Sequence, residues 1–183
     1  MGEAINLVNG FKVDKVIFNL GEYNYLELEF IKKLKKKNIL YYKNIEKLNI
    51  GNNMLYFLNN NLYDNENDNS NVIYLNFSNI KIIFMGDAGT EVEEDILDKY
   101  DLKDIDILKV GHHGSKTSTS NNFIDKINPK YSIISVGKNN RYGHPNSEVL
   151  GILNNSSIYR TDKDGSIVFK IKNSVLKIET YVP

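Results

Sequence analysis

The chain contains no cysteine and no tryptophan, and it has only three histidines in 183 residues. The absence of cysteine excludes disulfides and thiolate metal sites, so any bound metal must be held by His, Asp, Glu or Asn. The sequence has no apolar run of about 18 residues and therefore predicts no membrane-spanning helix. Its first residues lack a basic flank followed by an apolar stretch, so it also predicts no signal peptide.

An excess of charge of either sign is also missing, since 23 basic residues balance 23 acidic ones. This balance excludes the large basic field that a duplex-DNA binder would show, while leaving room for a local basic patch. A hydrophobic share of 41% over 183 residues is ordinary for a globular protein with a real core. We therefore expect one domain covering residues 1–183, and the composition does not indicate a compartment.

Hydrophobic periodicity predicts a mixed α/β fold in which helices cover a sheet. Helices are expected over residues 3–8, 22–37, 91–99, 121–127 and 147–153. Strands are expected over residues 13–19, 39–42, 54–58, 72–77, 81–84, 105–110, 131–136 and 157–160, and a hairpin over 166–172 and 175–181. The strand at 39–42 is expected to be buried. Segment 59–70 is rich in Asn and Asp, which predicts a solvated, mobile hairpin tip.

A carboxylate follows the apolar strand that ends near Phe84, in the sequence Gly86-Asp87-Ala88-Gly89. A side chain at the carboxyl end of such a strand points into the crevice where open α/β sheets bind ligands. Asp87 is therefore a candidate site residue. The alternative is that Asp87 only caps the helix that follows.

A histidine pair follows the next strand, in a loop of small and polar residues. Adjacent histidines leave an extended backbone in different directions, so one of His112 and His113 would bind a metal while the other orients or transfers a proton. Ser115, Lys116 and Thr117 supply donors of the kind that hold a phosphate. The alternative is a purely structural pair at the surface.

The third histidine follows a further apolar strand. His144 could act as a general acid or stabilise an oxyanion, and Pro145 stands where a helix could begin. The alternative is a structural turn. The side chains of this loop that could contact an anionic substrate are Lys138, Asn139, Asn140 and Arg141. Because all three loops follow strands of one sheet, we expect them to converge at a single site.

The order of these motifs resembles that of a known family. The motifs are Gly86-Asp87, the run His112 to Ser118, the run Lys130 to Pro145, and Tyr159-Arg160-Thr161-Asp162 followed by Gly165. From about residue 80 to 170 they resemble the metallo-β-lactamase-fold domain of the ComEC-type competence proteins and their soluble relatives. The resemblance implies an α/β (α+β) fold of the αββα sandwich type. It also implies a binuclear zinc or manganese site that activates a water for hydrolysis, usually of phosphodiesters.

The resemblance also assigns roles to the candidate residues. Asp87 would be a bridging metal ligand, and His112, rather than its neighbour, would be the last ligand of the site. His113 and His144 would then be the catalytic histidines. The substrate-binding residues would be Ser115, Lys116, Thr117, Asn139, Asn140 and Arg141.

One departure from the family pattern is large. The family's main metal motif, His-x-His-x-Asp-His, is missing, and in the family it precedes a helix that begins like Met1 to Ala4. We therefore expect the chain to be the C-terminal portion of such a domain, without its first strands. By itself it should bind catalytic metal weakly or not at all, be inactive, and self-associate through exposed sheet edges.

Three functions remain open at this point. The first is hydrolysis of phosphodiesters such as single-stranded DNA by a longer parent protein, which could be extracytoplasmic or membrane-linked. The second is a non-enzymatic module that binds nucleic acid or another phosphate ligand. The third is hydrolysis of a different ester, such as a phosphocholine ester, or of a lactone.

Overall fold

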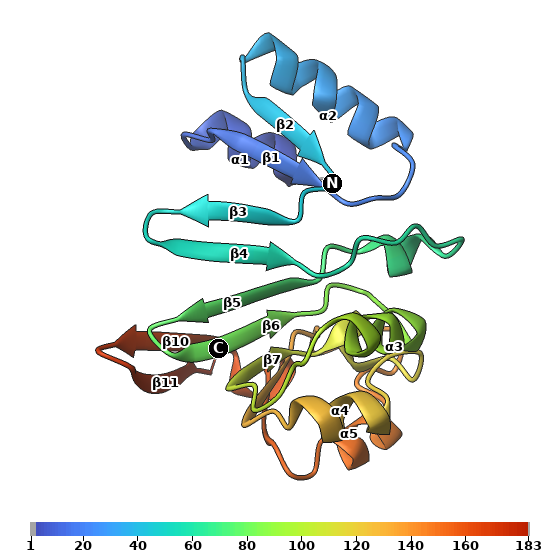
Figure 1. Cartoon of the computed structure of the whole chain (residues 1–183), viewed down its shortest axis with the longest axis vertical. Helices are drawn as coiled ribbons and strands as arrows, with labels where there is room; N and C mark the ends of the chain where they lie inside the picture. The colour runs from blue at the N-terminus through green and yellow to red at the C-terminus, as the bar shows by residue number, and fades with distance from the viewer. Residues whose placement is uncertain (1–2, 183) are drawn as a thin grey trace.

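A seven-stranded mixed sheet organises the computed structural model, which describes residues 3–182 (Figure 1). Its strands follow chain order, antiparallel from β3 to β6 and parallel from β6 to β9. Parallel neighbours need crossover connections, and here these contain the helices. The strands are β3 (Lys47–Ile50), β4 (Asn53–Phe57), β5 (Ile73–Phe77), β6 (Ile80–Phe84), β7 (Ile107–Lys109), β8 (Tyr131–Ile134) and β9 (Ser157–Arg160).

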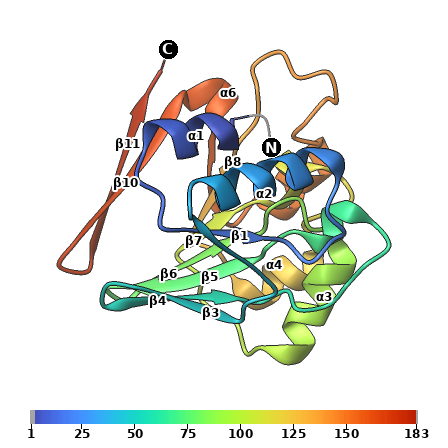
Figure 2. The same cartoon turned by 90° about the horizontal axis from the view of Figure 1, so that it is seen from above.

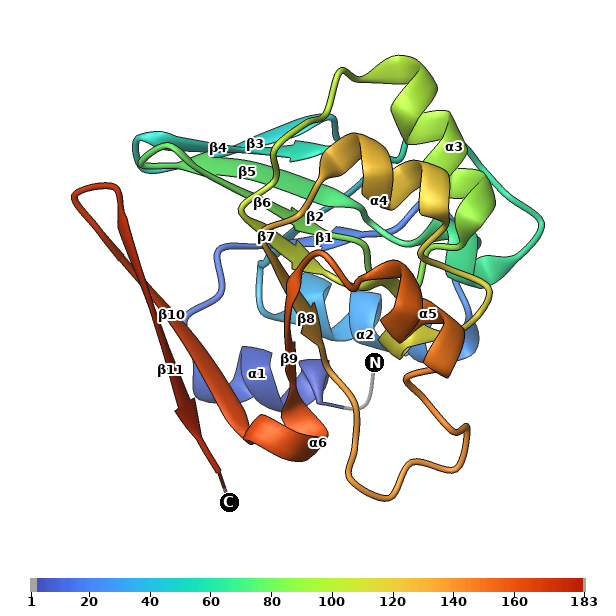
Figure 3. The ribbon, with the colours of Figure 1, turned by 90° about the horizontal axis from the view of Figure 1, so that it is seen from below.

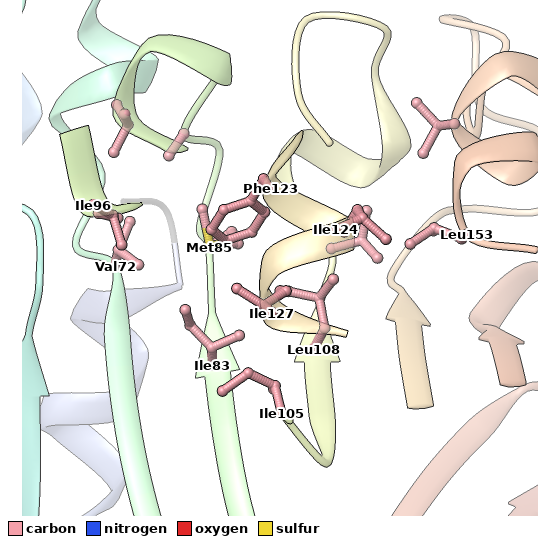
Figure 4. Packing of buried hydrophobic residues seen from close by; sticks show 14 of the residues in the cluster. Val72, Ile83, Met85, Ile96, Ile105, Leu108, Phe123, Ile124, Ile127 and Leu153 are labelled. Carbon is pink, nitrogen blue, oxygen red and sulfur yellow. The ribbon is translucent and has the colours of Figure 1, made fainter. Parts of the chain in front are cut away.

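Three helices cover one face of the parallel half of this sheet. They are α3 (Thr90–Lys99), α4 (Asn121–Ile127) and α5 (Ser147–Ile152), each within two residues of its predicted bounds. The core beneath them is closely packed, with Met85 beside Phe123 and Leu108 close to Ile127 (Figure 4). These four side chains are at most 1% exposed. Burial on this scale anchors the strand ends from which the three candidate loops emerge.

The opposite face of the sheet is covered by a hairpin of β10 (Ser166–Lys172) and β11 (Val175–Tyr181) (Figures 2 and 3). Phe169, Ile171 and Leu176 of the hairpin pack against the buried Ile80, Ile82 and Ile107. The hairpin and its turn at Asn173 and Ser174 are confirmed. Both turn residues have positive φ, 51° and 60°, as a tight two-residue connection requires.

The first part of the chain forms a smaller unit with its own core. It contains α1 (Ala4–Gly10), β1 (Lys15–Phe18), α2 (Tyr25–Lys36) and β2 (Leu40–Lys43), and β1 pairs with β2 in parallel. Figure 1 shows it at the end of the molecule away from α3, α4 and α5. The prediction of a buried strand at 39–42 is wrong. Leu40 is 58% and Tyr42 41% exposed, because the small core takes up only alternate residues such as Tyr41.

The segment 59–70 is solvated only in part. Residues 62 and 64–67 are exposed, as predicted, whereas Asn59, Asp68 and Asn69 are buried and Glu66–Asn69 form a 3₁₀ helix. The Asn59 amide donates to the carbonyls of Asp68 at 2.7 Å and Ser70 at 2.9 Å. Part of the polar composition thus reflects side chains that satisfy buried backbone groups rather than side chains that face water.

The predicted mixed α/β class is confirmed, and the finer αββα metallo-β-lactamase arrangement stays a prediction. Strand β3 and the four-residue helix α6 (Thr161–Asp164) were not predicted. Met1 and Gly2 of the expected first helix lie outside the described residues. Over residues 3–182, no helix combines the length and apolar character that spanning a bilayer would require.

Candidate functional site

The carboxyl ends of β6, β7 and β8 bring the three predicted loops together. These strands are adjacent and parallel, so their loops leave from the same edge of the sheet. Backbone hydrogen bonds join one loop to the next. The His112 amide donates to the Gly86 carbonyl at 3.0 Å, and the Asn146 amide donates to the Gly114 carbonyl at 2.9 Å. The convergence expected from the order of the strands is therefore present.

Asp87 and His113 face each other in this cluster. Asp87 does not cap α3, whose N-cap is Gly89 with no side-chain hydrogen bond, so the capping alternative is wrong. His113 Nε2 lies 3.7 Å from Asp87 Oδ1, and His113 Nδ1 lies 2.6 Å from the Ser135 carbonyl. A carbonyl only accepts, so Nδ1 carries the proton. In the neutral imidazole, the Nε2 lone pair then faces the carboxylate, an arrangement that a proton or a cation between them stabilises.

His112 points to a different part of the site. Its Nδ1 lies 3.3 Å from Thr117 Oγ1, and its ring centroid is 5.9 Å from that of His144. With Asp87, Asp68 and Thr117 it lines a cavity of about 180 Å³. Asp68 was not predicted here, because its segment has the composition of a solvated loop. The roles of His112 as metal ligand and His113 as catalytic residue stay predictions, and the contacts qualify both as ligands.

The histidine pair has an uncommon backbone. His112 and His113 have φ of 43° and 55°, in the left-handed region that non-glycine residues seldom occupy. Ser118 braces the turn, since its hydroxyl lies 3.0 Å from the carbonyls of both Gly111 and Ser115. Such conformations persist only where the surroundings hold them in place, and they are concentrated at functional sites.

A buried acid holds the far end of the same loop. Glu93 of α3 is 1% exposed and accepts hydrogen bonds from the amides of Thr119 at 2.5 Å and Ser120 at 2.8 Å. Burial raises the pKa of Glu93, and the two amides oppose that rise. Glu93 was not predicted as a site residue, and it positions the loop rather than entering the site.

His144 and its neighbours line a second cavity of about 470 Å³, together with His113, Ser135 and Gly137. Asn140 closes the loop on itself. Its amide donates to the His144 carbonyl at 2.7 Å, and its carbonyl oxygen accepts from the His144 amide at 2.9 Å. Burial, followed by the charges of His112 and His113, lowers the pKa of His144. Its imidazole is therefore neutral near neutral pH.

The predicted phosphate contacts divide into two groups. Ser115 is buried with its hydroxyl 3.0 Å from that of Thr117, and Asn140 is engaged within its own loop. The exposed members, which can meet a ligand at the surface, are Lys116, Thr117, Asn139 and Arg141.

Helix α5 begins at Ser147, and the side chain of Asn146 caps it. Pro145 therefore precedes the helix rather than being its first residue.

Lys109 is a further group that the sequence analysis missed. It lies in β7, and its ammonium donates to the Val110 carbonyl at 2.8 Å. Burial lowers the pKa of Lys109, and the nearby charge of Asp87 opposes the fall. The available signal in the sequence was a lysine within an apolar strand. Lys109 places its ammonium group close to the Asp87 carboxylate of the site.

The donors at the site suit zinc or manganese but do not form a full set. Asp87 Oδ1 and His113 Nε2 are 3.7 Å apart, and Zn–N and Zn–O bonds are about 2.0–2.2 Å, so one ion can reach both. Within residues 3–182, no three His, Cys, Asp or Glu side chains form a group that could hold a metal ion. The described side chains can thus supply some of the ligands of a metal centre, but not all of them.

The chain is similar to three proteins of bacterial competence and recombination, and no family model matches it. It is 42% identical over 120 residues to ComE operon protein 3 of Bacillus subtilis, covering 64% of this chain and 16% of that protein. It is 31% identical over 117 residues to competence protein ComA of Neisseria gonorrhoeae, covering 62% and 17%. With recombination protein 2 of Haemophilus influenzae it shares 32% over 116 residues, covering 62% and 14%. The chain thus spans less than a fifth of each relative.

Proposed function

We propose that the loops after β6, β7 and β8 form part of a metal-dependent hydrolase site that cleaves phosphodiesters in DNA. The observation that carries the proposal is the pair of Asp87 and His113. His113 Nε2 faces the Asp87 carboxylate at the sheet edge where His112 and His144 also meet. Similarity to competence and recombination proteins supports DNA as the substrate and DNA uptake as the setting.

Each residue then has a chemical role. Zinc or manganese, when bound, would supply a Lewis acid and an activated water. Asp87 and His113 would hold it, with the Ser135 carbonyl fixing the imidazole tautomer. His112 is a further candidate ligand. His144, neutral because its pKa is lowered, would accept a proton or pass one on across the cavity.

At least one further segment of polypeptide would have to supply metal ligands. A two-metal site needs more donors than Asp87 and the nearby histidines supply, and the chain spans less than a fifth of each relative. We therefore expect the 183-residue chain alone to bind metal weakly and to hydrolyse DNA slowly or not at all.

Calorimetric titration of the metal-free chain with Zn²⁺ and with Mn²⁺ tests this proposal. We expect weak binding that Asp87→Asn or His113→Ala abolishes. Asp98→Asn, which changes an exposed acid on α3, is the matched control and should bind as the parent chain does. Unchanged affinity in the Asp87 variant would place the metal elsewhere. Two tightly bound ions per chain would contradict the expected incompleteness.

A second candidate is a module that binds phosphate or nucleic acid without catalysis. The observation in its favour is the exposure of Lys116 and Arg141 beside an incomplete set of metal donors. This function predicts binding of single-stranded DNA that is independent of metal and sensitive to salt, and that Lys116→Ala and Arg141→Ala weaken. The hydrolase proposal instead predicts binding that added metal strengthens.

A further inference from the structure

Tyr142 presents an aromatic ring to solvent beside the candidate site. The ring is 84% exposed. It belongs to the loop between β8 and α5, which projects from the body of the molecule (Figure 3). A single exposed aromatic ring is common on protein surfaces. This one lines the same cavity of about 470 Å³ as His113 and His144, so its position calls for a functional explanation.

The ring of Tyr142 lies alongside that of His144. Tyr142 and His144 are nearly parallel, with an interplanar angle of 17° and ring centroids 5.9 Å apart. Two hydrogen bonds between Asn140 and the His144 backbone hold the loop that carries both rings. A surface that is ordered before binding loses little conformational entropy when a ligand settles on it.

The surroundings suit a chain of phosphates. Lys138 and Arg141 belong to the same loop as Tyr142 and are exposed, and neither forms an ion pair within residues 3–182. Apart from the adjacent residues of the chain, no atom of residues 3–182 lies within 4 Å of the position where a side chain on Gly137 or Gly143 would begin, so the backbone there is open to close approach. Flat aromatic rings next to cations are the features with which proteins bind single strands.

We propose that Tyr142, backed by His144, is a stacking platform for one unpaired nucleobase next to the scissile phosphodiester. This inference rests on the proposed function and adds a substrate preference to it. A base inside a duplex is covered on both faces by its neighbours, so only an unpaired base can lie on the ring. The site should therefore select single strands over duplexes, and nucleotides over phosphodiesters without a base.

The absence of tryptophan allows a direct test. Tyr142→Trp introduces the only tryptophan of the chain, whose fluorescence is quenched when a base stacks on it. The titration uses an oligothymidylate, an abasic oligomer of the same length and a blunt duplex, all in EDTA. We expect saturable quenching by the oligothymidylate alone. Tyr25→Trp on α2, where the parent residue is 74% exposed, is the matched control and should show none.

Affinity gives the second measurement, by fluorescence anisotropy of labelled oligomers in EDTA. Tyr142→Ala should weaken binding of the oligothymidylate by about 5- to 150-fold, the range for one base–aromatic stack, and Tyr142→Phe should retain it. Binding of the abasic oligomer should not change. Equal losses for both oligomers, no quenching, or no binding of single strands would each overturn the inference. Asp87→Asn separates the two proposals, because it should abolish metal binding and leave the quenching unchanged.

Discussion

A single buried carboxylate joins the Asn-rich segment to the site. Asp68 Oδ1 accepts a hydrogen bond of 2.6 Å from the Gly89 amide, and Asp68 is 6% exposed. In Asp68→Ala that amide is left buried without an acceptor, which should lower the free energy of unfolding by about 1–3 kcal/mol. Asp68→Asn keeps an oxygen at the same place and should lose clearly less. Urea denaturation measures both, and equal losses would mean that the hydrogen bond contributes nothing.

A second acid should make stability depend on pH. Arg160 binds the Asp162 carboxylate through two hydrogen bonds of 3.0 and 2.6 Å and holds its pKa below the ordinary value of 3.8. Below pH 3.8 the unfolded chain therefore binds more protons than the native one. This contribution to stability is present above pH 3.8 and is lost as pH falls through the native pKa.

Replacement of this acid should remove that dependence. Asp162→Asn should lower the free energy of unfolding at pH 7 by about 1.5–3 kcal/mol, the range for a hydrogen bond to a charged group. It should also flatten the decline below pH 4. Urea denaturation from pH 2 to pH 7 follows both effects, with the exposed Asp98→Asn as control. A decline as steep in Asp162→Asn as in the parent chain would show that other acids cause it.

Alanine substitutions at two glycines separate the free-energy cost of backbone strain from the cost of a clash between loops. Gly114 and Gly143 have φ of 79° and 70°, where a side chain costs roughly 1–2 kcal/mol. A Cβ at Gly114 would lie 2.6 Å from Pro145 Cβ, whereas a Cβ at Gly143 would have no atom within 4 Å among the described residues beyond its chain neighbours. Gly143→Ala should therefore show the strain alone. Gly114→Ala should cost a further ~1–3 kcal/mol and move the His113 loop away from the His144 loop.

Thermal unfolding measures the stability of both alanine variants, and the single-strand binding assay reports the geometry of the site. We expect Gly114→Ala to lose more stability and more affinity than Gly143→Ala. If the two variants behaved alike, the loops would not be in contact through Pro145.

The elements that the sequence predicted well are those whose pattern is local. The bounds of helix α4 and of the β10–β11 hairpin with its turn were predicted correctly. Hydrophobic periodicity and turn residues along the local sequence are enough to determine these elements. The segment 59–70 was misjudged in part since its partners, such as the Gly89 amide, lie far along the chain. Asp68 and Glu93 were missed for the same reason. Their importance comes from what they face, and composition does not show that.

At the scale of the whole molecule, the unpaired edges of the sheets should govern whether one copy of the chain associates with another. Among the described residues, β3 is paired only with β4, and Ile50 at its end is 53% exposed. A strand at an open edge offers unpaired backbone groups to another chain. We therefore expect self-association in sedimentation velocity as the concentration rises. Ile50→Lys should reduce it, because charge on an edge strand opposes pairing. Val175→Lys at an exposed site of β11 is the control, and a monomer at every concentration would refute the expectation.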